Sequence, residues 1–221
     1  MGSAKEVGPF LCDPCRAGII FIENKYCFRC GFPADISYEY PLAEFKCGPC
    51  RDGNFAFDRA RSLGLYDSVL KSLIRHFKYR KQPGAMKEIV PLLAAHFSAS
   101  GENYQGFHIV PIPLHTDKLR ERGFDQSYLV ARQMAGLLGL PFWDSLLMRV
   151  KATESQARMK KNERRKNVRG AFSLIRPEEA QGRDFLLVDD VFTTGSTVNE
   201  AAKVFKRAGA GRVYVFTLAR A

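Results

Sequence analysis

Two adjacent aspartates, Asp189 and Asp190, stand between an apolar run and a turn rich in hydroxyl groups. The stretch reads FLLVDDVFTTGSTV over residues 185–198. The short apolar run predicts a buried strand, and ligands of open parallel sheets bind outside the carboxyl ends of the strands. The pattern therefore predicts that this strand delivers both carboxylates to a ligand-binding edge.

The turn after the acid pair has the composition of a phosphate-binding loop. Unpaired amides at a helix start and the positive end of the helix dipole suit an anion. Gly195 lets the backbone curl around that anion, while Thr194, Ser196 and Thr197 add hydroxyl donors. Acids beside such a turn suit a sugar phosphate, with the acids on ribose hydroxyls. The alternative is an ordinary helix N-cap at Ser196, although capping does not explain two adjacent acids that repel each other.

Three C-x-x-C pairs within the first fifty residues predict a metal-binding module. Thiols in a reducing compartment favour zinc over disulfides, and four thiolates complete a closed structural site. The preferred ligand set, with sixteen residues between its pairs, is Cys27, Cys30, Cys47 and Cys50. An alternative set joins Cys12 and Cys15 to the first of those pairs, and a Cys12/Cys15 redox dithiol is a further interpretation.

The chain carries a formal net charge of +11, much of it in one block. Residues 149–169 hold nine basic and two acidic residues. This block predicts a polyanionic partner, either nucleic acid or a phosphorylated ligand, unless it is merely a solvated basic loop. Neither a secretory signal nor an apolar run of the ~20 residues needed to span a bilayer is evident, so we expect a cytoplasmic protein without membrane insertion.

Periodicity and breakers outline an α/β chain. Helices are expected at 67–79, 84–97, 125–140 and 196–210, and strands at 107–113, 183–190 and 212–220, with shorter strands flanking the basic block. Strand, helix and strand in close succession imply right-handed crossovers and a parallel sheet. We therefore expect two units, a cysteine-rich zinc module over residues 1–52 and an α/β domain over residues 58–221.

Several ordered motifs together resemble a known family. VDDVFTTGST (188–197) resembles the phosphoribosyl-pyrophosphate (PRPP) motif of type I phosphoribosyltransferases, and its TTG variant resembles the ComF competence family. The likeness extends over nearly the whole chain, through the cysteine pairs, HFKYR (76–80), VPIPLH (110–115), RERGFDQS (120–127), NERRKNVRGAF (162–172) and TLAR (217–220). The resemblance implies a type I phosphoribosyltransferase fold, with a mainly parallel five-stranded sheet between helices.

The resemblance also assigns roles to residues. It implies that the ribose hydroxyls meet the two acids, that the turn holds the 5-phosphate and that the VPIPLH loop faces the pyrophosphate. The implied PRPP-binding residues are Asp189, Asp190, Val191, Thr193, Thr194, Gly195, Ser196, Thr197, Leu114 and His115. Mg²⁺ is expected to arrive with PRPP, and structural Zn²⁺ to occupy the cysteine site.

Two departures from the family pattern bear on chemistry. Thr193 stands where purine-base transferases usually place an acidic base, which argues against conventional purine salvage. Asp125 stands where the family commonly has Asn. If the protein is a transferase, a nucleophile attacks C1 of PRPP and pyrophosphate leaves. Asp189, Asp190 and Arg122 are the catalytic candidates, with Lys118 and Arg120 also placed to neutralise the leaving group.

A second hypothesis is a protein of natural transformation that binds single-stranded DNA and keeps the fold as a scaffold or PRPP sensor. A competence helicase or other DNA-processing proteins would then be partners. Lysines and arginines would supply salt-dependent contacts to phosphates. The candidates are Lys118, Arg120, Arg158, Lys160, Lys161, Arg164, Arg165 and Arg169.

Overall fold

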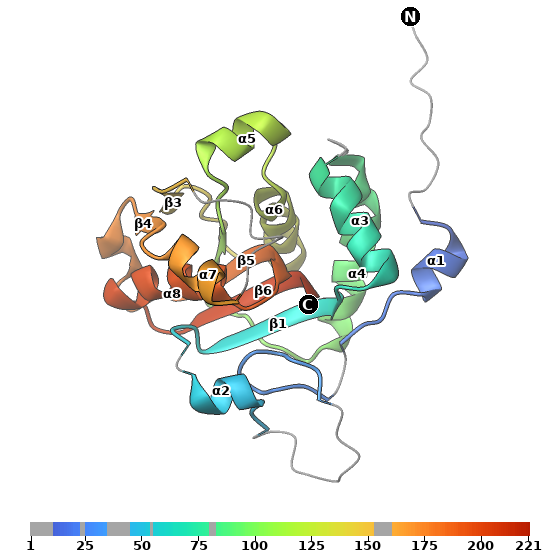
Figure 1. Ribbon diagram of the computed structural model, residues 1–221, viewed down its shortest axis with the longest axis horizontal. Coiled ribbons are helices and arrows are strands. Elements are labelled where there is room, and N and C mark those ends of the chain that lie inside the picture. The colour runs from blue at the N-terminus through green and yellow to red at the C-terminus, as the bar shows by residue number, and fades with distance from the viewer. Residues whose placement is uncertain (1–10, 23–24, 35–44, 54, 80–82, 153–160) are drawn as a thin grey trace, which may run out of the picture.

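Four parallel strands form the central sheet of the protein, in the order β1-β6-β5-β2. Figure 1 shows β1, β6 and β5 crossing the middle of the molecule. The computed structural model describes residues 11–22, 25–34, 45–53, 55–79, 83–152 and 161–221. The strands of this sheet are β1 (Arg59–Leu65), β2 (Phe107–Pro111), β5 (Asp184–Phe192) and β6 (Val213–Arg220). Because all four run in one direction, their carboxyl ends meet at a single edge.

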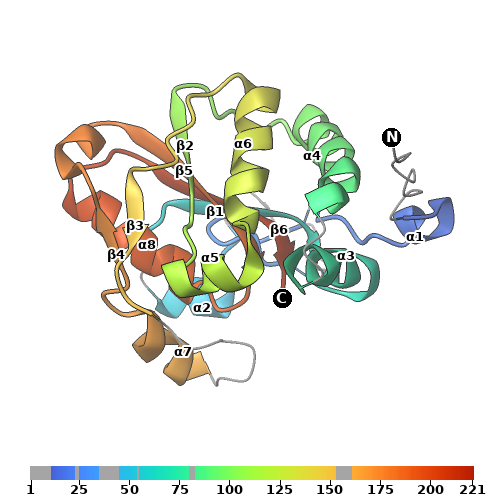
Figure 2. The ribbon, with the colours of Figure 1, turned by 90° about the horizontal axis from the view of Figure 1, so that it is seen from above.

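Helices cover both faces of this sheet, as the α/β pattern predicts. In Figures 1 and 2, α3 and α4 lie to one side of the sheet, and α7 and α8 lie to the other. The helices are α1 (Asp13–Ala17), α2 (Gly48–Asp52), α3 (Ser68–Tyr79), α4 (Met86–Ala99), α5 (Thr116–Arg122), α6 (Gln126–Leu138), α7 (Lys161–Val168) and α8 (Ser196–Arg207), with 3-10 turns at Pro83–Ala85 and Pro177–Ala180. Among these described helices, none is long and apolar enough to cross a membrane.

Strand alternation divides the core into two layers. Leu186 and Val188 of β5 pack with α3, α4 and α6, whereas Phe185 and Leu187 of the same strand pack in the layer that contains Phe205 of α8. This period of two is the expected signature of a strand that is buried on both faces. The buried strand in turn fixes the direction in which the residues after Val188 leave the sheet.

The sheet has one regular strand fewer than the five expected. Next to β2, the chain makes only an isolated parallel bridge, between Ile109 and Phe142. The Ile109 amide donates to the Pro141 carbonyl, and the Trp143 amide donates to the Ile109 carbonyl, each at 2.8 Å. Pro141 has no amide hydrogen of its own, which limits a ladder at this edge to a single rung. The parallel α/β architecture is confirmed, with this bridge in the place of a fifth strand.

A second, two-stranded sheet carries the flanks of the basic block. β3 (Leu147–Arg149) pairs antiparallel with β4 (Phe172–Leu174), and α7 precedes β4. Val168, at the end of α7, is 1% exposed, and the Gly170 amide donates to Glu200 of α8 at 2.9 Å. The end of the basic segment is therefore fastened to the central sheet through α8.

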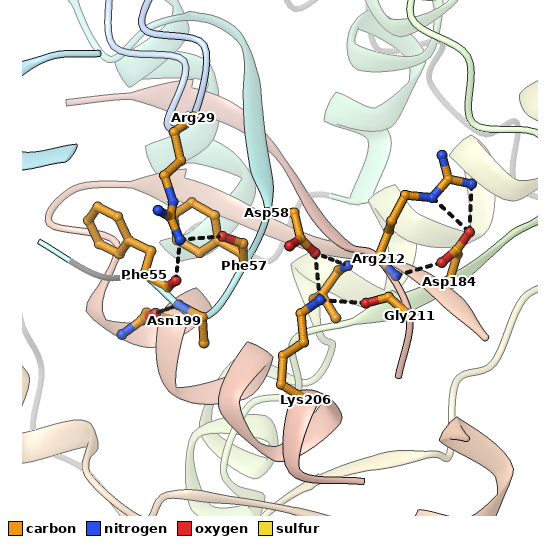
Figure 3. Close-up of polar contacts among 11 residues, drawn as sticks. Arg29, Phe55, Phe57, Asp58, Asp184, Asn199, Lys206, Gly211 and Arg212 are labelled. Atoms are coloured by element: carbon orange, nitrogen blue, oxygen red, sulfur yellow. Dashed lines mark hydrogen bonds and ion pairs between the residues drawn. The ribbon is translucent and has the colours of Figure 1, made fainter. Parts of the chain in front are cut away.

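The cysteine-rich segment covers the outer edge of β1. Ile22 donates its amide to Leu63, Leu65 donates to Ile20, and Ala60 donates to Arg29. Figure 3 shows how the connection to β1 is held: the Arg29 side chain donates to the carbonyls of Phe55 and Phe57, and Asn199 of α8 accepts the Ala56 amide at 2.6 Å. The segment and the sheet therefore share an extensive interface.

Candidate functional site

The preferred four cysteines come together in the structure. Cys27, Cys30, Cys47 and Cys50 are all buried, and their sulfur atoms lie within 4.8 Å of one another. The Cys30 and Cys47 sulfurs are 3.5 Å apart, close to the ~3.8 Å between ligands of a tetrahedral site with Zn–S bonds of about 2.3 Å. This cluster, called the four-cysteine cluster below, fits structural zinc.

The structure does not bring the alternative set together, because the upstream pair lies elsewhere. Cys12 directly precedes α1, Cys15 lies within its first turn, and both are exposed. Figure 1 shows α1 beside α3, away from α2, which begins directly after Cys47. Within the described residues, this leaves the downstream quartet as the one cysteine group with metal-binding geometry.

The acid pair lies near the end of β5, within the strand rather than after it. An ion pair joins Oδ2 of Asp190 to the ammonium group of Lys78 from α3 at 2.6 Å, and both side chains are largely buried. Although burial alone would lower the pKa of Lys78, the charge of Asp190 raises it above its ordinary value. Lys78 therefore stays charged and compensates one of the two carboxylates.

Asp189 has a different environment from its neighbour. Its Oδ1 accepts hydrogen bonds from the Ser127 hydroxyl at 3.1 Å and from the Asp190 amide at 2.9 Å. Burial, and then the charge of Asp190, raise the pKa of Asp189 to about 7. The pair therefore holds one carboxylate that forms an ion pair with Lys78 and one that gains or loses a proton near neutral pH.

This raised pKa predicts a pH dependence of stability. The folded protein holds the Asp189 proton up to about pH 7, whereas the unfolded chain releases it near 3.8. The contribution of Asp189 to the free energy of unfolding should thus be complete below pH 3.8 and lost as the pH rises through about 7. When the pH rises from 5 to 8, the free energy of unfolding should therefore decrease less in Asp189→Asn than in the wild type. Urea unfolding at the two pH values measures this difference.

Asp184→Asn provides a matched control on the same strand. Its salt bridge to Arg212 outweighs burial and lowers the pKa of Asp184. Stability from that group is therefore lost only at pH values below its ordinary pKa. Equal pH slopes for the wild type and Asp189→Asn between pH 5 and 8 would contradict the assignment.

The hydroxyl-rich turn begins α8 as expected. Gly195 has φ +73° and stands at the N-cap, where the side-chain oxygens of Thr194 and Ser196 lie 2.8 Å apart. A Cβ added to Gly195 would lie 2.5 Å from Cζ of Phe192, so the turn is built directly against that ring. Thr197 lies in the first turn of the helix, and partly buried Val191 packs against the core.

The RGFDQS motif organises the loop that follows β2. Asp125 caps α6 by accepting the Tyr128 amide at 3.2 Å, and its other oxygen accepts the Leu114 amide at 2.8 Å. The Leu114 amide, expected to face pyrophosphate, is thus bonded to Asp125. His115 caps α5 through a 3.4 Å contact of its Nδ1 with the Asp117 amide. An acid can perform this capping as well as the Asn of the family pattern.

Three cations gather beside this loop. Burial, with repulsion by Arg149 and Arg122, lowers the pKa of Lys118. Burial likewise lowers the pKa of Arg149, while attraction to Asp189 and Asp125 opposes that shift. Arg122 donates to Oε1 of Gln126 at 2.9 Å, and Nε2 of this 1% exposed glutamine has no hydrogen-bond partner among the described residues. Arg149 of β3 therefore lies within electrostatic reach of Asp189, with Lys118 and Arg122 of α5 next to it and an unsatisfied donor on Gln126.

The remaining nucleic-acid candidates are dispersed. Arg120 is exposed on α5, and Arg169 is exposed just after α7. Lys161, Arg164 and Arg165 belong to α7, and Arg158 and Lys160 lie outside the described residues. The structure thus divides the basic candidates between α5 at the sheet edge and the region of α7.

Four residues of this region were not among the predicted site residues: Lys78, Ser127, Arg149 and Arg220. Lys78 lies in HFKYR and Ser127 in RGFDQS, so both residues belong to motifs already identified in the sequence. What sequence patterns could not provide is the partner, because Lys78 meets Asp190 at a sequence separation of 112 residues. Residues that meet across a sheet edge leave no periodic signal in a single sequence.

Comparisons with known proteins support the motif-level likeness. No protein-family model matches the sequence. Competence protein F of Haemophilus influenzae is 31% identical over an aligned length of 223, and the alignment covers 96% of this chain and 97% of that protein. DNA utilization protein YhgH of Escherichia coli strain K12 is 32% identical, covering 90% of this chain and 85% of its own. Competence protein ComFC of Bacillus subtilis is 29% identical, covering 95% and 84%.

Similar solved structures include glutamine PRPP amidotransferase from B. subtilis, with a TM-score of 0.39, 20% identity and coverage of 59% of this chain and 25% of that one. Adenine phosphoribosyltransferase from Leishmania tarentolae gives a TM-score of 0.38, 15% identity and coverage of 62% and 71%. The 31% identity to Competence protein F extends over nearly the full length of both chains and establishes the family. This chain belongs to the ComF family of competence proteins.

Proposed function

We propose that the protein binds PRPP, or a related phosphoribosyl ligand, at the carboxyl edge of the sheet. Asp189 and Asp190 would accept hydrogen bonds from the ribose hydroxyls, and residues 193–197 would hold the 5-phosphate. The observation that carries this proposal is one arrangement: the acid pair and the α8 start share one strand end, Arg149 of β3 interacts with Asp189, and Lys118 and Arg122 of α5 lie next to Arg149.

The same arrangement supports a transfer reaction. An acceptor nucleophile would form a bond to C1 as the bond from C1 to the pyrophosphate oxygen breaks, and the electron pair would leave with pyrophosphate. Lys118, Arg122 and Arg149 would stabilise the charge that develops on the leaving group. Mg²⁺ bound with the pyrophosphate would add to this neutralisation, since the ion prefers phosphate and water oxygens.

Asp190→Asn is the direct test of this site. Calorimetric titration of PRPP with Mg²⁺ into the zinc-loaded protein should show saturable binding that weakens roughly 10- to 100-fold in the variant, because a charge-assisted hydrogen bond contributes about 1.5–3 kcal/mol. Asp144→Asn removes the same charge from an exposed turn before β3 and should bind as the wild type does. Wild-type protein that fails to bind PRPP would sink the proposal.

A second candidate function is binding of single-stranded DNA during natural transformation. The basic region around α7 favours it, because the described residues Lys166 and Arg169 are exposed there. The names of the relatives, a competence protein and a DNA utilization protein, favour a role in DNA handling. A competence helicase or another DNA-processing protein would be the partner class.

Salt dependence separates the two ligands. Affinity for an oligonucleotide should fall steeply as the salt concentration rises, because phosphate contacts release counterions. The affinity should be weaker in a Lys166→Gln/Arg169→Gln variant and unchanged in Asp190→Asn. Fluorescence anisotropy between about 50 and 200 mM salt measures this slope. Binding that is independent of salt would contradict a phosphate-contacting role for these residues.

A further inference from the structure

Arg220, the last residue of β6, joins the four-cysteine cluster to the end of β5. Its side chain donates from Nη1 to the Cys30 carbonyl at 2.9 Å and from Nη2 to the Cys30 sulfur at 3.4 Å. The guanidinium carbon lies 3.9 Å from the ring centroid of Phe192. A single cation, in a residue only 8% exposed, therefore contacts both a cluster sulfur and an aromatic ring of β5.

The charge of Arg220 complements an occupied cluster. Four thiolates around one Zn²⁺ retain two formal negative charges, and those charges are buried here. A buried guanidinium beside a sulfur offsets part of this charge, whereas the same guanidinium without charged thiolates would be an uncompensated buried cation. The position of Arg220 is therefore stabilised by the metal-loaded form of the cluster.

Phe192 lies between Arg220 and the phosphate-binding turn and contacts both. The ring carries Arg220 on one side, and a Cβ at Gly195 would lie within 2.5 Å of it. Interiors packed this closely transmit small displacements. If Arg220 lost its anchor at Cys30, the ring would be free to shift toward the backbone of Gly195, whose amide stands at the start of α8.

A cavity of about 730 Å³ also connects the four-cysteine cluster to the phosphate-binding turn. Its walls include cluster residues, turn residues and residues between them: Cys30, Cys47, Thr194, Ser196, Asn199 and Arg220. Among the described residues that line it, Arg220 is the only lysine or arginine. An anion held at the turn would therefore share this cavity with the cluster thiolates, and Arg220 would offset the repulsion between them.

We propose that Arg220 is a positioning residue that couples metal occupancy of the four-cysteine cluster to phosphate binding at residues 193–197. The coupling half of this inference rests on the proposed function, because it takes the turn as a phosphate site. Linkage then requires reciprocity: zinc strengthens binding of the phosphate ligand, and the ligand strengthens retention of zinc by the same factor.

Two substitutions and one control test the inference on the full-length protein. Arg220→Met removes the cation, and Arg220→Lys keeps a charge but loses the planar fork. Arg61→Lys is the matched control, because Arg61 is also buried and donates to the carbonyl of Phe28 in the cysteine segment, yet among the described residues none of its hydrogen bonds reaches a sulfur. Zinc affinity is measured by competition with a chromogenic chelator, with and without saturating ribose 5-phosphate.

Arg220→Met should lose roughly 10- to 100-fold in zinc affinity, as outer-sphere partners of metal ligands do. The zinc affinity of Arg220→Lys should lie between those of Arg220→Met and Arg61→Lys. The zinc affinity of Arg61→Lys should stay within about threefold of the wild-type value. Ribose 5-phosphate should raise wild-type zinc affinity by about fivefold or more, within the usual range of coupling between sites. That increase should disappear in Arg220→Met.

The outcomes distinguish the two proposals. Zinc retention in Arg220→Met equal to that in Arg61→Lys would overturn the role of Arg220 at the cluster. Weakened retention, together with ribose 5-phosphate that binds without changing zinc affinity, would overturn the coupling. If ribose 5-phosphate does not bind at all, the proposed phosphate site and the coupling both fail, while loss of zinc in Arg220→Met would still support the contact at the cluster.

Discussion

Replacing Cys47 with serine should release the metal and lower the melting temperature by about 10 °C or more. Loss of a structural metal belongs to the small class of changes that cost more than about 4 kcal/mol, and each kcal/mol shifts the midpoint by roughly 2–4 °C in a protein of this size. The effect should reach beyond the cysteine segment, because all four cysteines pack in one core layer with Phe57, Phe192 and Phe205. Metal analysis by mass spectrometry and calorimetry measure both parts.

Cys12→Ser is the matched control for this prediction. It replaces the same atom in another C-x-x-C pair, but one that is exposed and lies outside the cluster. It should retain one zinc per chain and the wild-type melting temperature. If Cys12→Ser and Cys47→Ser lost equal amounts of zinc, the assignment of the ligands to the downstream quartet would be wrong.

Lys78→Met should destabilise the protein by about 3–5 kcal/mol at neutral pH. Removing one partner of a buried ion pair leaves the other charge without compensation, and here a second carboxylate adjoins it. The cost should shrink at pH 5, where Asp189 is protonated and no longer places a second negative charge beside Asp190. Urea unfolding at pH 7.5 and pH 5 tests both statements.

Lys71→Met controls for the loss of a lysine from α3, because Lys71 is exposed on the same helix. The double variant Lys78→Met/Asp190→Asn should recover much of the stability, since it removes both members of the pair. A cost for Lys78→Met no greater than that for Lys71→Met would show that the ion pair contributes little to folding.

Local chemistry was predictable from the sequence because the residues concerned are close along the chain. The strand before Asp189, the glycine at the start of α8 and the spacing of Cys27 to Cys50 are all short-range patterns, and the structure contains each of them. Helix α7 was missed because its segment has almost no apolar period. Its order comes from Val168 and from the contact of Gly170 with Glu200.

The missing parts of the site share a single cause. Ser127 reaches Asp189 across 62 positions, and Arg220 reaches Cys30 across 190 positions. Both pairings depend on which strand lies next to which, and no spacing rule in one sequence encodes that order. The role of Asp125 was equally hidden, since its carboxylate accepts hydrogen bonds from the backbone amides of Leu114 and Tyr128.

The strand order also has a consequence for synthesis on the ribosome. β6 lies between β1 and β5. The first strand of the sheet therefore cannot pair with this neighbour until residues 213–220 have been synthesised. An unpaired strand edge invites association with other chains. Ile20, Ile22 and Arg29 bond to the opposite edge of β1 and emerge before it. A nascent chain that captures its metal early, with the folding energy this supplies, would therefore have one side of β1 shielded while the rest of the sheet is still being made.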